Sequence, residues 1–142
     1  MSKSPSDATI VEAIGQLAFE AMAVLTRIAG EQDLSLTQLR VLGILRDRRL
    51  KMVELAAYLG LEKSTMTGLV ARAEHRGLMR RSPNPDDRRA VDVTLTESGR
   101  RLVDTHYGDF VRALDPLVSR LDQADRDQLE QLVRRMLGTL QP

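Results

Sequence analysis

The chain has 142 residues, of which 42% are hydrophobic and 29% charged, and its net charge is +1, values typical of one soluble globular domain. It has no cysteine, which excludes disulfides, thiolate metal sites and redox sensing through a thiol. No apolar run approaches the length of a membrane span, and the first residues lack the apolar core of a secretory signal. The sequence therefore predicts a cytoplasmic protein without membrane contact.

A long amphipathic helix is expected over residues 7–29. Its apolar positions recur every three or four residues over about six turns, and Gly30 is expected to end it. The stripe consists of Ile10, Ile14, Leu17, Ala18, Ala21, Leu25 and Ile28. A helix of this length has more apolar surface than a small domain core needs, so part of it is expected to contact something else.

A capped helix is expected next. Ser35 and Gln38 have the spacing of a capping box, in which each side chain accepts a hydrogen bond from the other residue's backbone N–H. The apolar stripe that follows ends at the charged run of residues 46–49, and residues 50–51 are expected to form an extended link.

The middle of the chain has the spacing of a helix-turn-helix. Residues 52–59 form a short helix that Gly60 ends, and a second helix follows over residues 63–76, with Gly77 after it. The positions expected to be buried are Val53, Leu55, Ala56 and Leu59 on the first helix and Met66, Leu69, Val70 and Ala73 on the second.

The opposite face of the second helix has short polar side chains and becomes cationic toward its end. A face of this kind can lie close to the floor of the major groove of DNA, where hydroxyl groups meet base edges or phosphates. Gly68 costs about 1 kcal/mol relative to alanine inside a helix, which favours close approach to a partner over the alternative, an ordinary solvated face. The residues of this face are Ser64, Thr65, Thr67, Gly68, Ala71, Arg72 and His75.

A hairpin with a basic tip follows the helix-turn-helix. Its strands are expected over residues 79–82 and 91–95, joined by the turn residues 83–87. Between Arg72 and Arg89 there are six arginines and three carboxylates, although the whole chain is almost neutral. Such a local cluster is typical of a surface that binds phosphates.

The tip of this hairpin is the second candidate DNA contact. An arginine at a hairpin tip can enter the minor groove, where narrow stretches concentrate negative potential. Arg88 and Arg89 are the candidates, and the carboxylate of Asp87 can orient a guanidinium or tie the hairpin to the preceding helix. A solvated turn is the alternative, and the helix-turn-helix before the tip favours DNA.

Two more amphipathic helices are expected after the hairpin. Thr96 caps the first, Pro116 is expected to kink or interrupt it, and Asp122 or Asp125 begins the second. Their apolar stripes consist of Leu102, Val103, His106, Tyr107, Phe110, Leu114, Leu117 and Leu121, and of Leu129, Leu132, Val133, Met136, Leu137 and Leu140.

Three segments together resemble the MarR family of bacterial winged helix-turn-helix transcription regulators. They are LSLTQLRVLGIL, ELAAYLGLEKSTMTGLVARAEHRGLM and PDDRRAVDVTLTESGRRL, whose most specific part is Asp87 and Arg89 followed by a strand and Leu95-Thr96. The resemblance implies a mainly α (α+β) fold, a single domain over 1–142 with a winged helix-turn-helix lobe over 35–96 and dimerisation helices over 7–30 and 97–140.

The same resemblance implies a homodimer on a near-palindromic double-stranded DNA operator, with the recognition helix 63–76 in the major groove and the wing 80–95 in the minor groove. Carried over residue by residue, Ser64, Thr65, Thr67 and Arg72 become helix contacts. Arg89, helped by Arg88 and oriented by Asp87, becomes the wing contact. Three residues depart from the family pattern: Lys51 and Glu62, where a capping side chain is usual, and Gly68, where a long polar residue is frequent.

Many members of the family respond to small, often aromatic anions bound between the dimer helices and the DNA-binding lobe. The resemblance therefore implies a repressor that such an effector releases from DNA, and Arg27, His106 and Tyr107 are the candidate contacts. The alternatives are a core histidine and a packing tyrosine, a regulator without an effector, and a winged helix that binds another protein.

The sequence does not predict an enzyme. The two histidines lie 31 residues apart in a chain without cysteine and form no metal-ligand or nucleophile–base pattern. The carboxylates do not converge, and there is no glycine-rich phosphate loop. No metal, cofactor or catalytic residue is therefore expected.

Overall fold

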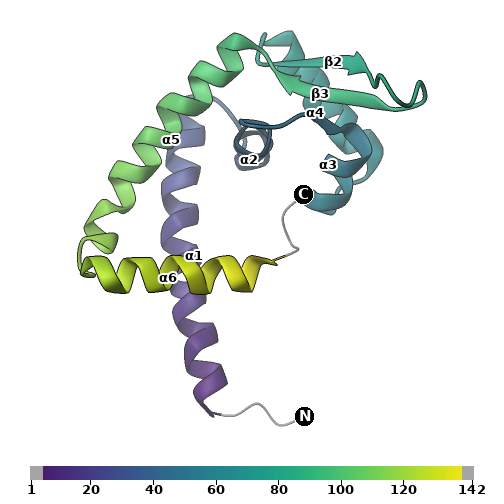
Figure 1. Ribbon diagram of the computed structural model, residues 1–142. Helices are drawn as coiled ribbons and strands as arrows, with labels where there is room; N and C mark the ends of the chain where they lie inside the picture. Colours follow the sequence, from purple (N-terminus) through teal and green to yellow (C-terminus); the bar gives the residue numbers. More distant parts are fainter. Residues whose placement is uncertain (1–4, 139–142) are drawn as a thin grey trace.

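The structure, a computed structural model, describes residues 5–138 as helices around one small sheet (Figure 1). This arrangement confirms the predicted mainly α winged helix-turn-helix fold. The elements in chain order are α1 (Pro5–Glu31), α2 (Leu36–Ile44), β1 (Leu50–Lys51), α3 (Met52–Leu59), α4 (Lys63–His75), β2 (Met79–Pro83), β3 (Val91–Leu95), α5 (Glu97–Val118) and α6 (Gln123–Leu137).

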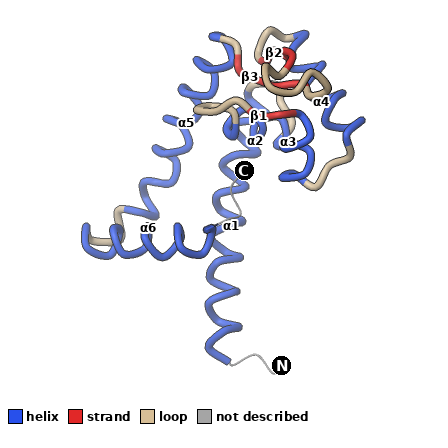
Figure 2. Tube along the Cα trace, turned by 45° about the vertical axis from the view of Figure 1, so that its right-hand side comes forward, coloured by secondary structure: helices blue, strands red, loops and turns tan. Residues whose placement is uncertain are grey.

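The sheet has three antiparallel strands in the order β1-β3-β2. The pairing of Met79 with Leu95 and of Pro83 with Val91 makes β2 and β3 the predicted hairpin, the wing of the fold. The extended link at residues 50–51 is β1, which pairs Leu50 with Val93. Figure 2 shows the three strands confined to the lobe that α2, α3 and α4 form.

Most helix ends lie where the local sequence predicts them. Both hydrogen bonds of the capping box form, from the Gln38 backbone N–H to Ser35 Oγ at 3.1 Å and from the Ser35 N–H to Gln38 Oε1 at 2.9 Å. Gly60 and Gly77 have φ angles of 65° and 74°, in the left-handed region that glycine adopts without strain. Asp122 rather than Asp125 caps α6, since its carboxylate accepts from the Asp125 N–H at 2.9 Å.

The predicted end of the first helix was wrong. The helix continues through Gly30 to Glu31, because glycine also tolerates a helical conformation in a last turn. Pro116 does not interrupt α5, since it lies in the last turn of this helix, which ends at Val118. The alternative, that the proline kinks the helix, stays a prediction. Leu140, assigned to the last apolar stripe, lies outside the described residues.

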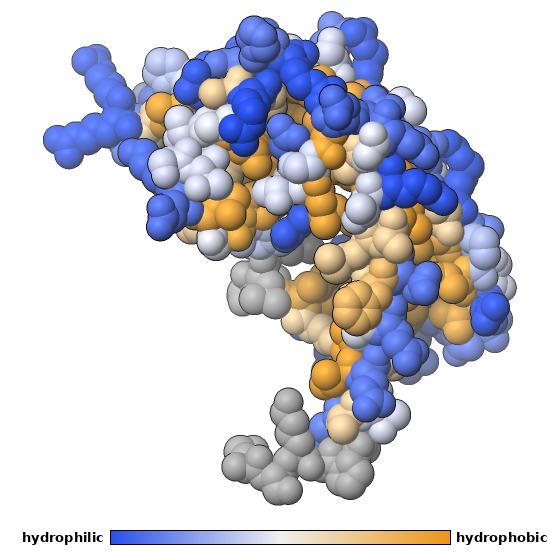
Figure 3. Space-filling model, turned by 180° about the vertical axis from the view of Figure 1, so that it is seen from behind, coloured by the Kyte–Doolittle hydropathy of each residue, from blue (hydrophilic) through white to orange (hydrophobic). Residues whose placement is uncertain are grey.

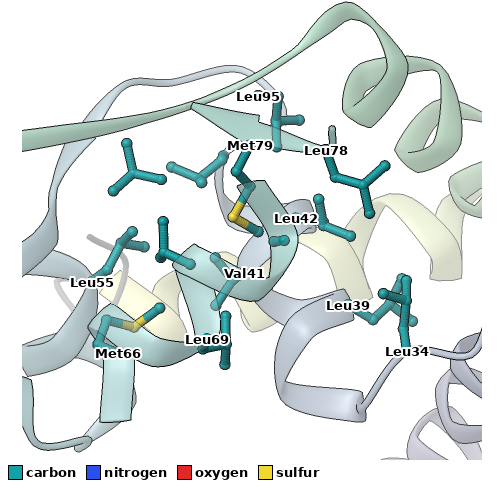
Figure 4. Close-up of a cluster of buried hydrophobic side chains, with 14 of the residues drawn as sticks. Leu34, Leu39, Val41, Leu42, Leu55, Met66, Leu69, Leu78, Met79 and Leu95 are labelled. Atoms are coloured by element: carbon teal, nitrogen blue, oxygen red, sulfur yellow. The ribbon is translucent and has the colours of Figure 1, made fainter. Parts of the chain in front are cut away.

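The core lies between α2, the helix-turn-helix and the sheet (Figure 4), and α1 and α5 add residues to it. The four positions predicted as the inner face of the recognition helix, Met66, Leu69, Val70 and Ala73, are all buried. On α3 the prediction for Val53 was wrong, because its side chain is 53% exposed and Met52 is buried instead. The inner face of this short helix begins at Met52 and continues with residues three and four positions on, which turns Val53 aside.

The two ends of the chain expose apolar side chains. The described part of α6 has no buried residue, and residues 7–20 of α1 have none. Figure 3 shows apolar side chains gathered below a largely hydrophilic lobe. The exposed large apolar residues of these end helices are Ile10, Val11, Ile14, Leu17, Phe19 and Met22 on α1, Tyr107, Val111, Leu117 and Val118 on α5, and Leu129, Leu132, Val133, Met136 and Leu137 on α6.

The expectation that no apolar run is long enough to cross a membrane was wrong for α1. Residues Asp7–Glu31 have the length and composition of such a helix, with a mean hydropathy of 1.5. Alanine and glycine between the larger apolar residues keep this stretch apolar without lengthening any continuous run of large side chains. The large apolar side chains responsible are exposed, as are those of α5 and α6.

Candidate nucleic-acid interface

The recognition helix α4 presents its predicted face to solvent. Ser64, Thr65 and Arg72 are exposed, and Thr67, Gly68 and Ala71 are partly exposed, while the opposite side of the helix is buried in the core. The hydroxyl of Thr67 donates to the backbone oxygen of Lys63 at 2.8 Å, which leaves its lone pairs available to a donor outside the chain. The core therefore holds the buried face of α4, and the opposite face is accessible to a partner.

Packing within the chain does not require the glycine at position 68. A Cβ added there would lie 3.5 Å from Nη1 of Arg72, an ordinary contact with the end of a flexible side chain. The glycine lowers the surface of the helix beside Arg72 without relieving any internal clash. The space it leaves is thus available to a molecule that approaches the helix from outside.

The wing tip is an ordered turn that residues 84–90 hold by hydrogen bonds. Oδ1 of Asn84 accepts from the backbone N–H groups of Asp86 and Asp87, both at 2.9 Å. The Asn84 N–H donates to the Ala90 oxygen at 3.1 Å, and the Ala90 N–H donates to the Asp87 oxygen at 3.0 Å. Oδ1 of Asp87 accepts from the Arg89 backbone N–H at 3.0 Å. Asp87 therefore positions the backbone of Arg89 in this structure, rather than its guanidinium.

A different pair ties the hairpin to the recognition helix. The carboxylate of Glu74, on α4, accepts from the Arg81 backbone N–H at 3.0 Å and from its guanidinium at 2.9 and 3.1 Å. The Arg81 backbone N–H first, and then the guanidinium, hold the pKa of Glu74 below its usual range. The predicted link between helix and hairpin exists, but Glu74 makes it and Asp87 does not.

The arginine cluster divides into internal and outward groups. Besides Arg81, Arg76 is internal, since its guanidinium donates to the backbone oxygens of Gln32 at 2.9 Å and Asp33 at 3.0 Å. Within residues 5–138, no hydrogen bond or ion pair engages the guanidinium groups of the remaining four, Arg72, Arg80, Arg88 and Arg89. These four cations are free to meet an anionic partner.

One hollow of about 220 Å³ joins the recognition helix to the wing. Lys63 and Thr67 line it from α4, and Arg81 and Arg89 line it from the wing. Exposed Val53 forms part of its floor together with Met52, Ala90 and Val91. Figure 1 shows the hairpin extending beside α4. The start of the recognition helix and the wing arginine thus share one concave, cationic surface.

The wing also contains a buried carboxylate that sequence reasoning missed. Asp92 on β3 is only 2% exposed, and its two oxygens accept from Nε of Arg49 at 2.5 Å and from Nδ2 of Asn84 at 2.8 Å. The Asn84 amide first, and then Arg49, hold the pKa of Asp92 below its usual range against the effect of burial. Strand alternation places Asp92 opposite Val91 and Val93 and so indicated exposure, and the sequence contains no local sign of its partner Arg49.

A second cavity, of about 210 Å³, lies between α1, α2 and α5. Two of the three predicted effector contacts line it, since buried His106 and half-exposed Tyr107 both face it. Arg27 does not, because it lines a separate hollow with Glu31, Asp109 and Arg112. The residues around the first cavity are Leu25, Ile28, Leu39, Gly43, Arg46, Asp47, Val103, His106, Tyr107 and Phe110.

Arg46 is the cation of this cavity, and sequence reasoning missed it. Its guanidinium carbon lies 4.3 Å from the centroid of the Tyr107 ring, and its Nε donates to Oδ1 of Asp104 at 2.8 Å. The hydrogen bond to Asp104 is the main cause that raises the pKa of Arg46. Nδ1 of His106, which also lines the cavity, lies 3.3 Å from Oδ2 of Asp109. The sequence shows Arg46 only as the first residue of a charged run at a helix end.

The described residues hold no group of three or more His, Asp or Glu side chains that could bind a metal ion.

Known proteins resemble this chain in sequence and in fold. The model of the MarR family matches residues 34–91. The HTH-type transcriptional repressor NicR of Pseudomonas putida is 31% identical over 97% of this chain and 92% of its own length. A crystal structure of a MepR mutant from S. aureus superposes with a TM-score of 0.80, at 24% identity over 99% of this chain and 100% of that one. NadR in complex with 4-hydroxyphenylacetate superposes with a TM-score of 0.78, at 21% identity over 98% and 99% of the two chains.

Proposed function

The chain belongs to the MarR family of DNA-binding transcription regulators, which are not enzymes, and we propose that it is a homodimeric repressor released from its operator by a small aromatic or anionic effector. In this proposal α4 enters the major groove of a near-palindromic site, and the wing enters the adjacent minor groove. Ser64, Thr65, Thr67, Gly68, Ala71 and Arg72 on the helix, and Asp87, Arg88 and Arg89 on the wing, form the DNA-binding surface.

The observation that carries this proposal is the cationic hollow shared by α4 and the wing. Lys63 and Arg89 approach it from two different elements, so one duplex backbone could pass between them while each element enters its own groove. The four arginines without partners in the described chain lie on these same two elements. A surface of this shape and charge suits a phosphate backbone better than it suits an apolar protein partner.

The dimer is supported by the exposed apolar surface of α1, α5 and α6. A single chain leaves α6 without a buried residue, which is unusual for a helix with apolar side chains at helical spacing. A second copy would cover this surface and the apolar stripe of α1 together, so we assign residues 7–30 and 97–140 to the interface. Burial against the second chain would also explain why α1 is as apolar as a membrane-spanning helix.

The effector is supported by the cavity beside Arg46. Its lining combines apolar side chains with a guanidinium, a histidine and a tyrosine, which suits a flat molecule with an acidic group. NadR, of the same fold, is known in complex with 4-hydroxyphenylacetate, an aromatic acid. The relative NicR is named a repressor, and we propose the same sign of regulation here.

The deciding experiment is selection of bound fragments from genomic DNA, followed by anisotropy titration of a recovered fragment against salt. We expect the logarithm of the binding constant to fall with the logarithm of salt by about 0.9 per phosphate contact. A protein that enriches no fragment, or binds with no salt dependence, would contradict the DNA-binding surface. Adding candidate aromatic acids to the same titration tests release, and an unchanged affinity across them would argue against the effector.

A further inference from the structure

The wing contains a chain of polar contacts that begins at its buried end. Asp92 is enclosed in the sheet although it bears a charge, and each of its carboxylate oxygens has one strong donor, Arg49 on one side and Asn84 on the other. If one of these donors moved away, the oxygen it serves would stay buried without a hydrogen bond, which costs free energy. Both donors are therefore held firmly in place.

The Arg49 end of the chain reaches across the whole sheet. Arg49 precedes β1, yet its Nη2 lies 3.3 Å from Ser82 Oγ and 3.5 Å from the Pro83 oxygen, both on β2. Together with its bond to Asp92 on β3, the guanidinium links the start of β1 to the two strands of the wing. The wing therefore cannot swing relative to β1 without breaking a contact to a buried charge.

The Asn84 end of the chain reaches the wing tip. The amide of Asn84 uses its nitrogen for Asp92 and its oxygen for the backbone N–H groups of Asp86 and Asp87. Asp87 in turn accepts from the backbone N–H of Arg89. Each step fixes the next, so the position of the Arg89 backbone depends on a carboxylate buried elsewhere in the sheet.

We propose that Arg49, Asp92 and Asn84 are positioning residues that set the wing tip in its DNA-binding conformation before DNA arrives. We call these three residues the wing anchor. The proposal rests on the proposed function, because it takes Arg89 as the wing contact with DNA. A tip that is ordered in the free protein loses less conformational entropy on binding, so a released tip binds more weakly even though no DNA contact has been removed.

The test compares Asp92→Asn with Arg89→Ala in the full chain, on a genomic fragment selected by the wild-type protein. Asp92→Asn preserves shape but presents an NH2 group to one of two donors, so it breaks the anchor at one end. It also removes a negative charge, which by itself would tighten DNA binding. Loss of the anchor and loss of the charge therefore change the affinity in opposite directions.

We expect Asp92→Asn to weaken binding about fivefold to tenfold, the effect of losing part of one groove contact. We also expect the Asp86 and Asp87 amide hydrogens to exchange at least about tenfold faster, as for local opening of an ordered turn. The double variant with Arg89→Ala should bind no more weakly than Arg89→Ala alone, because the anchor acts through that arginine.

Asn84→Ala, at the partly exposed tip, should reproduce these results if Asp92→Asn disturbs folding. Ser82→Ala is the matched control, since it removes only a longer contact to Arg49 and should leave exchange and affinity unchanged.

The proposal is overturned if Asp92→Asn and Asn84→Ala bind as tightly as the wild type, if the exchange of the tip amides stays the same, or if their losses add to that of Arg89→Ala. These outcomes differ from failure of the proposed function. If Arg89→Ala itself leaves affinity unchanged, the wing assignment fails and the anchor loses its role with it. If Arg89→Ala weakens binding and the anchor variants do not, the anchor alone is rejected.

Discussion

The α-carbon of Gly99 lies against the backbone carbonyl of Leu78, so closely that a Cβ at position 99 would fall 2.0 Å from that oxygen. The same carbonyl accepts from the backbone N–H of Thr96 at 3.1 Å, and the Thr96 hydroxyl donates to the oxygen of Gly77 at 2.5 Å. These contacts join the first turn of α5 to the end of the recognition helix. Arg76 joins that same end to the residues after α1, so both long helices hold α4 at one point.

Replacing Gly99 by alanine should destabilise the fold by about 3 kcal/mol, the upper part of the usual range for overpacking, because the obstacle is backbone and cannot rotate away. The free energy of urea unfolding measures this. Gly108→Ala, in the same helix, is the control, since its Cβ would meet only the end of the Arg112 side chain at 3.4 Å. That variant should be neutral or up to about 1 kcal/mol more stable. Equal stability of the two variants would contradict the close approach.

Gly68→Ala should have opposite effects on stability and on DNA binding. Alanine is the better helix former by about 1 kcal/mol and meets no clash at this position, so the free energy of unfolding should rise. If the helix backbone lies close to DNA, the added methyl group should weaken binding. Thermal unfolding and anisotropy on a selected fragment give the two values. Unweakened binding would show that position 68 does not face the groove floor.

Arg89→Ala should weaken operator binding by about 1–3 kcal/mol while the protein remains folded and dimeric. The reason is that Arg89 lines the hollow beside α4 and has no side-chain partner within residues 5–138 that would otherwise occupy it. Anisotropy measures the affinity. Arg40→Ala is the control, because Arg40 is an exposed arginine on α2, outside the proposed DNA-binding surface and the proposed dimer interface, and this variant should bind DNA as the wild type does. Equal losses in both variants would point to total charge instead of the wing.

Acid should weaken the fold through Asp92 and Glu74, whose pKa values lie below their usual range. A carboxyl with a lower pKa in the folded state adds stability above its unfolded pKa, about 4, and this contribution is lost as the pH falls through the folded pKa. The charged groups nearest Asp92 are Arg49 and Lys51, which favour its ionised form. Urea unfolding should therefore show no change from these two groups above about pH 5.

The matched variant for this prediction is Asp92→Asn. Below about pH 4 its free energy of unfolding should fall less steeply than that of the wild type, because one shifted carboxyl is gone. If the free energies of unfolding of the two proteins fall in parallel with pH, the low pKa of Asp92 in the folded state is contradicted.

Removing residues 122–142 should give monomers in analytical ultracentrifugation, because it removes α6 from the proposed interface. Leu132→Asp is a gentler variant of the same test. Leu132 is 44% exposed in a single chain, so a charge there should leave the fold of one chain intact and weaken only its contact with a second chain. Tyr58→Ser, at an exposed apolar residue of the DNA-binding lobe, should stay dimeric. A truncated chain that still dimerises would refute this interface.

The sequence predicted what local patterns determine. The helical spacing of Met66, Leu69, Val70 and Ala73 sets the buried face of α4, and Gly60 and Gly77 mark the turns on either side. The outward polarity of the recognition helix follows from the same spacing. These features depend on neighbours within a few residues, so periodicity and turn chemistry are enough to find them.

What the sequence did not predict depends on partners far along the chain. Asp92 is buried because Arg49, 43 residues earlier, and Asn84 satisfy its oxygens. Arg46 lines the cavity between α1, α2 and α5, where Asp104, 58 residues later, hydrogen-bonds to its guanidinium and Tyr107 lies beneath it. Strand alternation and a charged run at a helix end both indicated solvent, and tertiary contacts overrode them.

The exposed surface of α6 has a consequence for how the protein responds to its own abundance. If the protein binds its operator as a dimer, the concentration of the binding species rises with the square of the chain concentration wherever monomers predominate. A modest fall in synthesis would then lower operator occupancy more steeply than it would for a repressor that binds as a monomer. By the same mass action, the melting temperature should rise as the protein is concentrated, and dilution alone should loosen the helices at both ends of the chain.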